Sequence, residues 1–447
     1  MSGGDPALSE GDVNRSPLRA AWRATLSAQT QRLLDEDERY FLRQSLSTPC
    51  LDVIERAEGA VLVDVEGREI LDFHGNSAHQ LGYGHPKVIA AIKAELDRLP
   101  FCPRRYANRP ATALAERLTQ LAPMQPAKVL FAPSGAAAVS MALKLARYAT
   151  GRHKVLSMWD AFHGANLDTI SVGGEALFRR GLGPMTPGGE HLPPLHLARR
   201  FFGEDDKAHL RLADYIDYVL EAQGDVGALI AEPMRWTTVE PPPEGFWGLV
   251  KRSCERHGAL LIFDEIPSCL GRTGTMFFCE QAGASPDILV IGKGLGGGVM
   301  PMAAIIAPAS LDLAPEAALG HYTHEKSPVG SAAALAALEA IAEEGLLPRA
   351  LELGAIGFQR LAELKARHAA IADIRGVGAY FGVEMAGKDP AEADARAERL
   401  LYACLERGLS FKVGAGKVAT LCPPLTIPND QFERAFDILE EAFSTLS

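Results

Sequence analysis

The sequence lacks the features that mark several classes of protein. Its seven cysteines are odd in number and form no CxxC pair, so neither a disulfide framework nor a zinc site is expected. No segment contains the ~18 consecutive apolar residues that a membrane-spanning helix needs, and the first thirty residues contain no apolar stretch of a secretion signal. We therefore expect reduced thiols, no metal site and a cytoplasmic protein.

The sequence also lacks an excess of positive charge. Its 45 Lys and Arg residues stand against 56 Asp and Glu residues, and the formal net charge is -11. This balance argues against nucleic acid or an anionic membrane surface as a partner, although a local basic pocket could still bind a small anion. A small-molecule substrate is the expected partner.

What the sequence does contain is enough apolar material for a large core. Hydrophobic residues make up 47% of the chain, and its 447 residues exceed what one core usually covers, so we predict two domains. A mobile tail (1–20) should precede a segment that joins the small domain (21–105). A large domain (106–345) and a C-terminal small domain (346–447) should follow.

Short apolar runs alternate with helical patterns in the predicted large domain. They lie at residues 128–131, 154–158, 226–231, 259–263 and 287–291. Such runs are typical of strands buried on both faces, which predicts an α/β fold with a mostly parallel sheet between helices. Functional groups should lie at the carboxyl ends of these strands.

Two charged residues follow buried strands. Asp264 ends the apolar run in LLIFDEIPSCLGRTG, where a carboxylate is costly to desolvate unless it has a cationic partner. A protonated pyridine nitrogen would be such a partner, but a helix cap or a structural ion pair would also account for Asp264. Lys293 follows the run in PDILVIGKGLGGG, where a lysine in a dry environment can lose its proton and become a nucleophile for Schiff-base chemistry. The GxGxxG spacing that begins at Gly292 lacks the context of a dinucleotide site.

Two further strand ends carry weaker signals. Ser134, Gly135 and Ala136 form a turn before a helix, and the first backbone N–H groups of a helix can bind a phosphate. Phe162 and His163 follow another strand, where an aromatic ring could stack on a planar cofactor, or could equally belong to the core.

Three motifs together resemble the class-III PLP-dependent aminotransferase family. They are DE(V/I)xxxxGRTG at residues 264–274, the lysine motif KGLGGG ending at Gly298, and the stretch from PPxGF to HGALLIFDE at residues 242–265. The resemblance covers nearly the whole chain. It implies fold type I of these enzymes, a mostly parallel seven-stranded sheet flanked by helices plus a smaller α+β domain, and the cofactor pyridoxal 5'-phosphate (PLP).

The resemblance also assigns roles to residues. Lys293 would bind PLP as an aldimine, and Asp264 would pair with the pyridine nitrogen, which makes these two the implied catalytic residues. Ile266 and Phe162 would pack on the two faces of the ring. The remaining implied cofactor contacts are Ser134, Gly135, Ala136, His163, Glu232 and Thr323. Thr323 would reach the phosphate of the neighbouring subunit, which implies a homodimer with shared active sites.

The sequence departs from the family at the places of a common Glu–Arg switch, which lets transaminases bind two carboxylates in turn. Thr237 stands at the glutamate's place in AEPMRWTTVE, and Thr420 stands at the arginine's place before the Pro-Pro pair. Pro267 and Ala136 also replace residues that commonly contact the cofactor.

The segments HGNSAHQLGYGHP, DEIPSCLGRTG and YTHEKSP resemble the branch of this family that contains (R)-1-hydroxy-2-aminoethylphosphonate ammonia-lyase. This implies a lyase that forms phosphonoacetaldehyde and ammonia without an amino acceptor. The alternatives are a class-III aminotransferase that moves an amino group from an amine or ω-amino acid to a keto acid, a racemase or aminomutase, and a regulator that has lost the chemistry.

A phosphonate substrate needs cations and hydrogen-bond donors. The candidate substrate contacts are Arg104, Arg105, Arg235, Lys412, His74, Asn76 and His79. Each has a structural alternative, because adjacent arginines usually point in opposite directions and a histidine is often a satisfied core residue.

Overall fold

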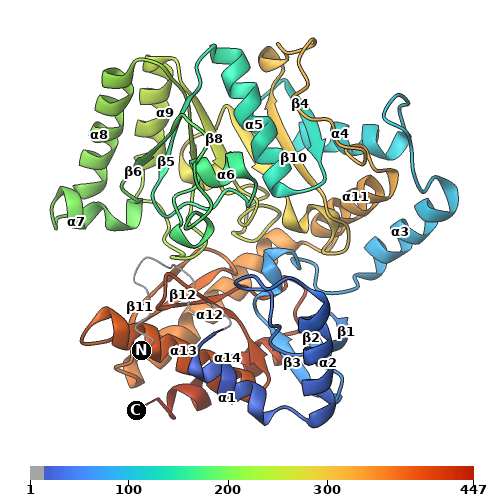
Figure 1. Cartoon of the computed structure of the whole chain (residues 1–447), viewed down its shortest axis with the longest axis vertical. Helices are drawn as coiled ribbons and strands as arrows, with labels where there is room; N and C mark the ends of the chain where they lie inside the picture. Colours follow the sequence, from blue (N-terminus) through green and yellow to red (C-terminus); the bar gives the residue numbers. More distant parts are fainter. Residues whose placement is uncertain (1–14, 447) are drawn as a thin grey trace.

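The computed structural model describes residues 15–446 and builds its larger part around a seven-stranded sheet (Figure 1). The strands in spatial order are β4 (Ala127–Ala132), β10 (Ala303–Pro308), β9 (Ile288–Ile291), β8 (Leu260–Asp264), β7 (Val226–Ala231), β5 (Lys154–Met158) and β6 (Gly189–Leu192). All neighbours are parallel except for β10, which is antiparallel to both β4 and β9. The predicted fold class is confirmed.

Strands β6 and β10 were not predicted, because β6 (GEHL) contains no apolar run and β10 (AAIIAP) is half alanine.

Helices cover both faces of this sheet. They are α4 (Arg109–Leu121), α5 (Gly135–Thr150), α6 (Leu167–Val172), α7 (Ala198–Phe202), α8 (Ala208–Gln223), α9 (Phe246–His257), α10 (Cys279–Ala282) and α11 (Pro328–Glu343). Alternate strand residues divide between two core clusters, as the two-residue repeat of a strand requires. Ile262 packs in the cluster that contains α5, while Phe263 packs with Trp247 of α9. Strands buried on both faces explain why their sequences read as continuous apolar runs.

Six of the seven strands end at the same edge of the sheet. Strands β4, β5, β6, β7, β8 and β9 run in one direction, and β10 alone is antiparallel to its neighbours. The segments that follow β4, β5, β7, β8 and β9 therefore meet, and they carry the residues singled out in the sequence: 134–136, 162–163, Glu232, 264–266 and Lys293.

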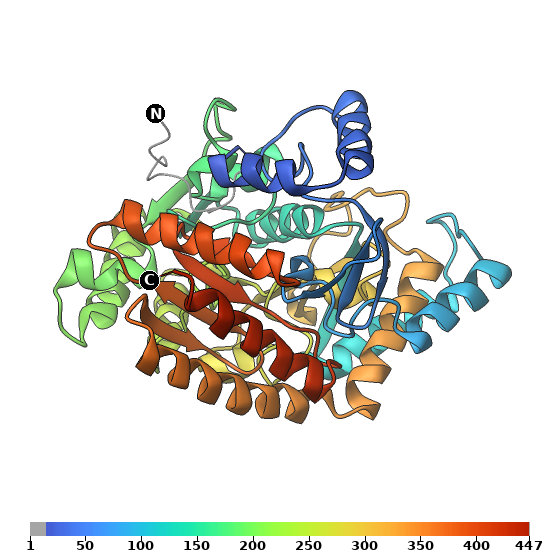
Figure 2. The same ribbon diagram turned by 90° about the horizontal axis from the view of Figure 1, so that it is seen from below.

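The remainder of the chain forms two four-stranded sheets. The strands of the first, in spatial order, are β1 (Ile54–Glu58), β2 (Val61–Asp64), β3 (Glu69–Asp72) and β13 (Leu409–Ser410). The strands of the second are β11 (Ile371–Gly376), β12 (Phe381–Met385), β15 (Val418–Leu421) and β14 (Lys412–Gly414). Figure 2 shows α12 (Leu346–Arg367), α13 (Pro390–Glu406) and α14 (Asn429–Phe443) side by side across this part. Because β13 pairs with β3, N-terminal and C-terminal segments share a sheet.

The N-terminal region contributes three helices, α1 (Pro17–Thr25), α2 (Ala28–Tyr40) and α3 (Pro86–Arg98). Residues 1–14 of the predicted tail lie outside the described residues, and the tail was predicted to end too late, because Ser16 already caps α1 with its side chain. The other domain boundaries stay predictions. Within residues 15–446, no helix is both long enough and apolar enough to cross a membrane.

Candidate active site

A cavity of about 430 Å³ opens at the edge where the parallel strands end. The larger part of the chain lines it with Gly135, Ala136, Phe162, His163, Gly164, Ala165, Glu175, Phe178, Glu232, Arg235, Trp236, Thr237, Asp264, Ile266, Pro267 and Lys293. The rest of its lining comes from Leu46, His74, Asn76 and Lys412. The cavity therefore lies between the seven-stranded sheet and the smaller sheets.

Lys293 follows β9 and projects into this cavity. Its backbone is held at φ +49°, a left-handed conformation that costs a residue with a side chain about 1 kcal/mol or more. Removal of the amine from bulk water lowers the pKa of Lys293, and the positive charge of Lys412 lowers it further against the opposing charges of Glu232 and Asp264. A lysine with a lowered pKa supplies the uncharged amine that nucleophilic and proton-transfer chemistry needs.

Asp264 ends β8 and is oriented by a histidine. Its Oδ2 atom lies 2.8 Å from His163 Nδ1, and its Oδ1 atom accepts a hydrogen bond from the backbone N–H of Ile266 at 3.2 Å. The other ring nitrogen of His163 lies 3.4 Å from Ser157 Oγ. Because Asp264 and His163 are both almost fully buried, the carboxylate of Asp264 has a fixed direction toward the cavity.

The N-terminus of α5 offers an anion site. Ser134 caps this 16-residue helix and accepts a hydrogen bond from the N–H of Ala137 at 3.2 Å, so Ser134 itself is not part of the cavity lining. Gly135 and Ala136, in the first turn, do line the cavity, and N–H groups there have no partner within the helix. A Cβ atom on Gly135 would lie 2.7 Å from Ile266 Cδ1, so the glycine keeps this approach open.

Apolar side chains complete the cavity. Ile266 lies beside Gly135, and Phe162 packs against Phe178 with 4.3 Å between ring centroids. The lysine amine, the buried carboxylate, the helix N-terminus and these apolar walls together match the aldehyde, pyridine nitrogen, phosphate and flat ring of PLP. The residues present therefore fit the cofactor that the resemblance implies.

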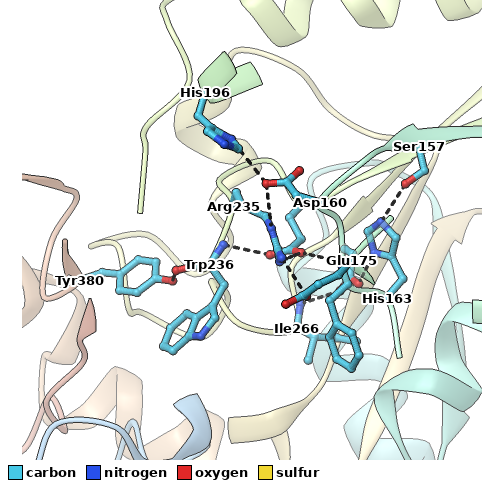
Figure 3. A network of polar contacts seen from close by, with 12 residues as sticks. Ser157, Asp160, His163, Glu175, His196, Arg235, Trp236, Ile266 and Tyr380 are labelled. Carbon is cyan, nitrogen blue, oxygen red and sulfur yellow. Dashed lines mark hydrogen bonds and ion pairs between the residues drawn. The ribbon is translucent and has the colours of Figure 1, made fainter. Parts of the chain in front are cut away.

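Arg235 lies in a network of carboxylates (Figure 3), two of which, Glu175 and Glu232, also line the cavity. Its guanidinium lies 2.6 Å from Glu232 Oε1, 3.1 Å from Glu175 Oε2 and 3.6 Å from Asp160 Oδ2. Burial would raise the pKa of Glu232, but the charges of Arg235 and His163 hold that pKa below its ordinary value. Arg235 thus neutralises buried carboxylates and also lines the cavity, and its contact with a substrate stays a prediction.

The structure brings together only part of the predicted substrate site. His74, Asn76 and Lys412 line the cavity. Burial lowers the pKa of His74 to about 4, so its imidazole is uncharged near neutral pH. His79 does not line the cavity, because its ring is buried behind the wall with Nε2 at 3.1 Å from the backbone oxygen of Asp72.

Three predicted residues lie away from the cavity of their own chain. Arg104 contacts His321 at 2.9 Å and Glu325 at 3.7 Å, in the same loop region that carries Thr323. Arg104, its neighbour Arg105 and Thr323 are absent from the cavity lining. Any role for them in this site requires a second copy of the chain.

Sequence reasoning missed the aromatic wall near Lys293. Trp236 lies with its ring centroid 5.3 Å from Lys293 Nζ and stacks on Tyr380 at 4.7 Å. The Tyr380 hydroxyl donates a hydrogen bond to the backbone oxygen of Trp236 at 2.8 Å. The position of Trp236 shortly after β7 was the available signal, but its partner Tyr380 is remote in sequence. Glu175 and Phe178 were also missed, because they lie in a loop without a motif.

Comparison with known proteins places this geometry among characterised enzymes. The model of the aminotransferase class-III family matches residues 43–443. The (R)-1-hydroxy-2-aminoethylphosphonate ammonia-lyase of Vibrio splendidus is 44% identical, over 98% of this chain and 95% of its own. The 5-aminovalerate aminotransferase of Pseudomonas aeruginosa is 36% identical, over 88% of this chain and 94% of the relative. The solved PMP-bound form of an aminotransferase from Vibrio fluvialis superposes with a TM-score of 0.85 at 26% identity, over 94% of this chain and 98% of that structure.

The ion pairs of Arg235 predict a large effect on stability. Replacing Arg235 with Ala leaves Glu232 and Glu175 buried without their cation, and we expect the free energy of unfolding to fall by about 3–5 kcal/mol. Arg199→Ala is the matched control, since Arg199 pairs with Asp206 on the surface, and it should change stability little. Urea denaturation of both variants measures the difference. Equal stability of the two would contradict a structural role for Arg235.

Proposed function

The chain belongs to the aminotransferase class-III family, and from that premise we propose that it is an ammonia-lyase acting on a small hydroxy-amine with a phosphonate group, (R)-1-hydroxy-2-aminoethylphosphonate. It is a PLP-dependent enzyme. The relative from Vibrio splendidus supports the lyase reaction, while the aminotransferase relatives supply the alternative.

One observation carries the choice of a lyase over a transaminase. A transaminase must bind the carboxylate of a keto acid, and an arginine matches a planar carboxylate with two parallel hydrogen bonds. Among the described residues that line the cavity, Arg235 is the only arginine, and three carboxylates surround it. Threonines stand at both places of the family's Glu–Arg switch. A lyase needs no keto acid and therefore no switch.

The proposed roles of the residues follow from the geometry of the cavity. PLP, when bound, would supply an electron sink for the carbon beside the substrate's nitrogen. Lys293 would anchor the cofactor and take the proton from that carbon, and its lowered pKa favours the uncharged amine that this requires. Asp264, oriented by His163, keeps a proton on the pyridine nitrogen. The N–H groups of Gly135 and Ala136 donate to the phosphate.

The proposed net reaction is balanced without a co-substrate. The substrate loses hydroxide from the carbon next to the one that bears nitrogen, and water later replaces the nitrogen, so the products are phosphonoacetaldehyde and ammonia. No amino group remains on the enzyme after a turnover. A transaminase, in contrast, stops after one half-reaction until a keto acid arrives.

We also propose that the active form is a homodimer. Arg104 contacts the loop that carries Thr323, and both residues lie outside the cavity of their own chain. Thr323 then completes the phosphate site of the neighbouring subunit, as the family resemblance implies.

Ammonia release without a keto acid tests the lyase reaction. With (R)-1-hydroxy-2-aminoethylphosphonate alone, we expect many equivalents of ammonia and phosphonoacetaldehyde per enzyme, and no alanine when ordinary amino donors are supplied with pyruvate. The control omits substrate. A single equivalent of product without keto acid, with sustained alanine formation when pyruvate is added, would show the aminotransferase reaction instead.

Lys293→Ala tests the role of the lysine. The visible absorbance of lysine-bound cofactor should disappear, and ammonia release should fall by about 10²–10⁴-fold or more because the anchoring amine and the base are both lost. The exposed Lys417 provides the matched control, and Lys417→Ala should keep both signals. Retention of absorbance and turnover in Lys293→Ala would remove Lys293 from the mechanism.

Light scattering tests the shared site. The holoenzyme should have about twice the mass of one chain, because Thr323 can reach a cofactor only from a neighbouring subunit. Thr323→Ala should leave this mass unchanged and weaken retention of the cofactor. An active monomer would contradict the homodimer.

A further inference from the structure

Strand β14 and the segment after β7 together form one side of the cavity. Lys412 and Gly414 are two residues apart on β14 and so project to the same face of the strand. A Cβ atom on Gly414 would lie 2.5 Å from the backbone oxygen of Thr237 and 3.0 Å from its Cβ. This face of β14 therefore lies directly against Thr237, and both Thr237 and Lys412 line the cavity.

Lys412 brings positive charge to the part of the cavity where the chemistry occurs. After burial itself, its charge is the largest influence that lowers the pKa of Lys293, and it also lowers the pKa of His74. Lys412 lines the same cavity as Lys293, on the strand that packs against the segment carrying Thr237.

Thr237 offers a buried hydroxyl beside this lysine. The residue is 3% exposed, and its Oγ1 atom has no hydrogen-bond partner among the described residues. A buried hydroxyl without a partner is unfavourable, so a ligand oxygen in the cavity would stabilise it. Its place in the sequence is that of the switch glutamate in the resembling family. A glutamate there would put a carboxylate against the face of β14 that carries Lys412, and would repel an anionic substrate group.

Thr420 lies on β15, the strand next to Lys412, at the place of the switch arginine. It pairs with Lys412 across β14 and β15 and is 1% exposed. The switch arginine of the family would stand here, one strand away from Lys412. This chain thus carries a positive charge at Lys412 and hydroxyls at the paired Thr420 and at Thr237.

We infer that Lys412 and Thr237 form the subsite for the anionic group of the substrate, and that this subsite selects a tetrahedral phosphonate over a planar carboxylate. The inference rests on the proposed function and specifies which residues recognise its substrate. A lysine acts as a compact point charge, so it attracts a phosphonate, which can carry two negative charges, more strongly than a carboxylate, which carries one. The third phosphonate oxygen can accept from Thr237.

Binding of methylphosphonate to the PLP-loaded enzyme tests this subsite without turnover. Calorimetric titration should show tighter binding of methylphosphonate than of acetate to the wild type. Lys412→Ala should weaken methylphosphonate binding at least about tenfold, as expected for loss of one charge-assisted contact. Lys417→Ala is the matched control, because Lys417 lies between β14 and β15 but pairs with Glu384 at the surface, and it should bind methylphosphonate as the wild type does.

Variants of Thr237 test the second half of the subsite. Thr237→Val removes only the hydroxyl and should weaken methylphosphonate binding about three- to tenfold. Thr237→Glu should abolish measurable binding because it adds a negative charge beside Lys412. Thr238→Val is the matched control, since Thr238 is equally buried with an unpartnered Oγ1 but does not line this cavity, and it should have no effect. Cofactor absorbance reports on intact folding in every variant.

The outcomes separate this inference from the lyase reaction. Unchanged methylphosphonate affinity in both Lys412→Ala and Thr237→Glu would overturn the subsite, even if the wild type releases ammonia from the phosphonate substrate. Equal affinity of the wild type for acetate and methylphosphonate would overturn the selectivity. Loss of affinity in these variants, in an enzyme that releases no ammonia, would support the subsite and contradict the lyase.

Discussion

Burial of charged groups at one edge of the seven-stranded sheet is the constraint on which the active site depends. Parallel strands covered on both faces end in a region that is poor in water, where each carboxylate or amine requires a partner. Asp264 has His163, and Glu232 has Arg235. The same dryness lowers the pKa of Lys293 and so prepares an amine for chemistry at neutral pH. The fold itself thus creates the reactivity of the lysine.

The lining of the cavity comes from two parts of the chain. Segments after the parallel strands supply the lysine, the carboxylate and the helix N-terminus that fit PLP. His74, Asn76 and Lys412 are added from the smaller sheets and their connections, and β14 packs against the segment after β7. The cavity is therefore complete only when the two parts pack together.

The arginine after β7 shows how the surroundings of a cation decide its function. Arg235 faces the cavity, and its sequence position alone makes it a reasonable anion contact. Three carboxylates within 4 Å of its guanidinium give it a structural role as well. Ion pairs within the wall thereby determine how much of the arginine's charge acts on the cavity.

The sequence by itself determined the α/β class and the candidates Lys293 and Asp264, because strands buried on both faces are continuous apolar runs and a charged residue directly after such a run is conspicuous. It did not reveal β6, which has no apolar run, or β10, whose apolar run is half alanine, a residue that is depleted in strands. Only the tertiary structure decided that Arg235 is surrounded by carboxylates, that His79 is enclosed behind the wall, and that Lys412 meets Thr237. Each of these depends on contacts between distant segments, and local patterns of hydrophobicity carry no information about which segments meet.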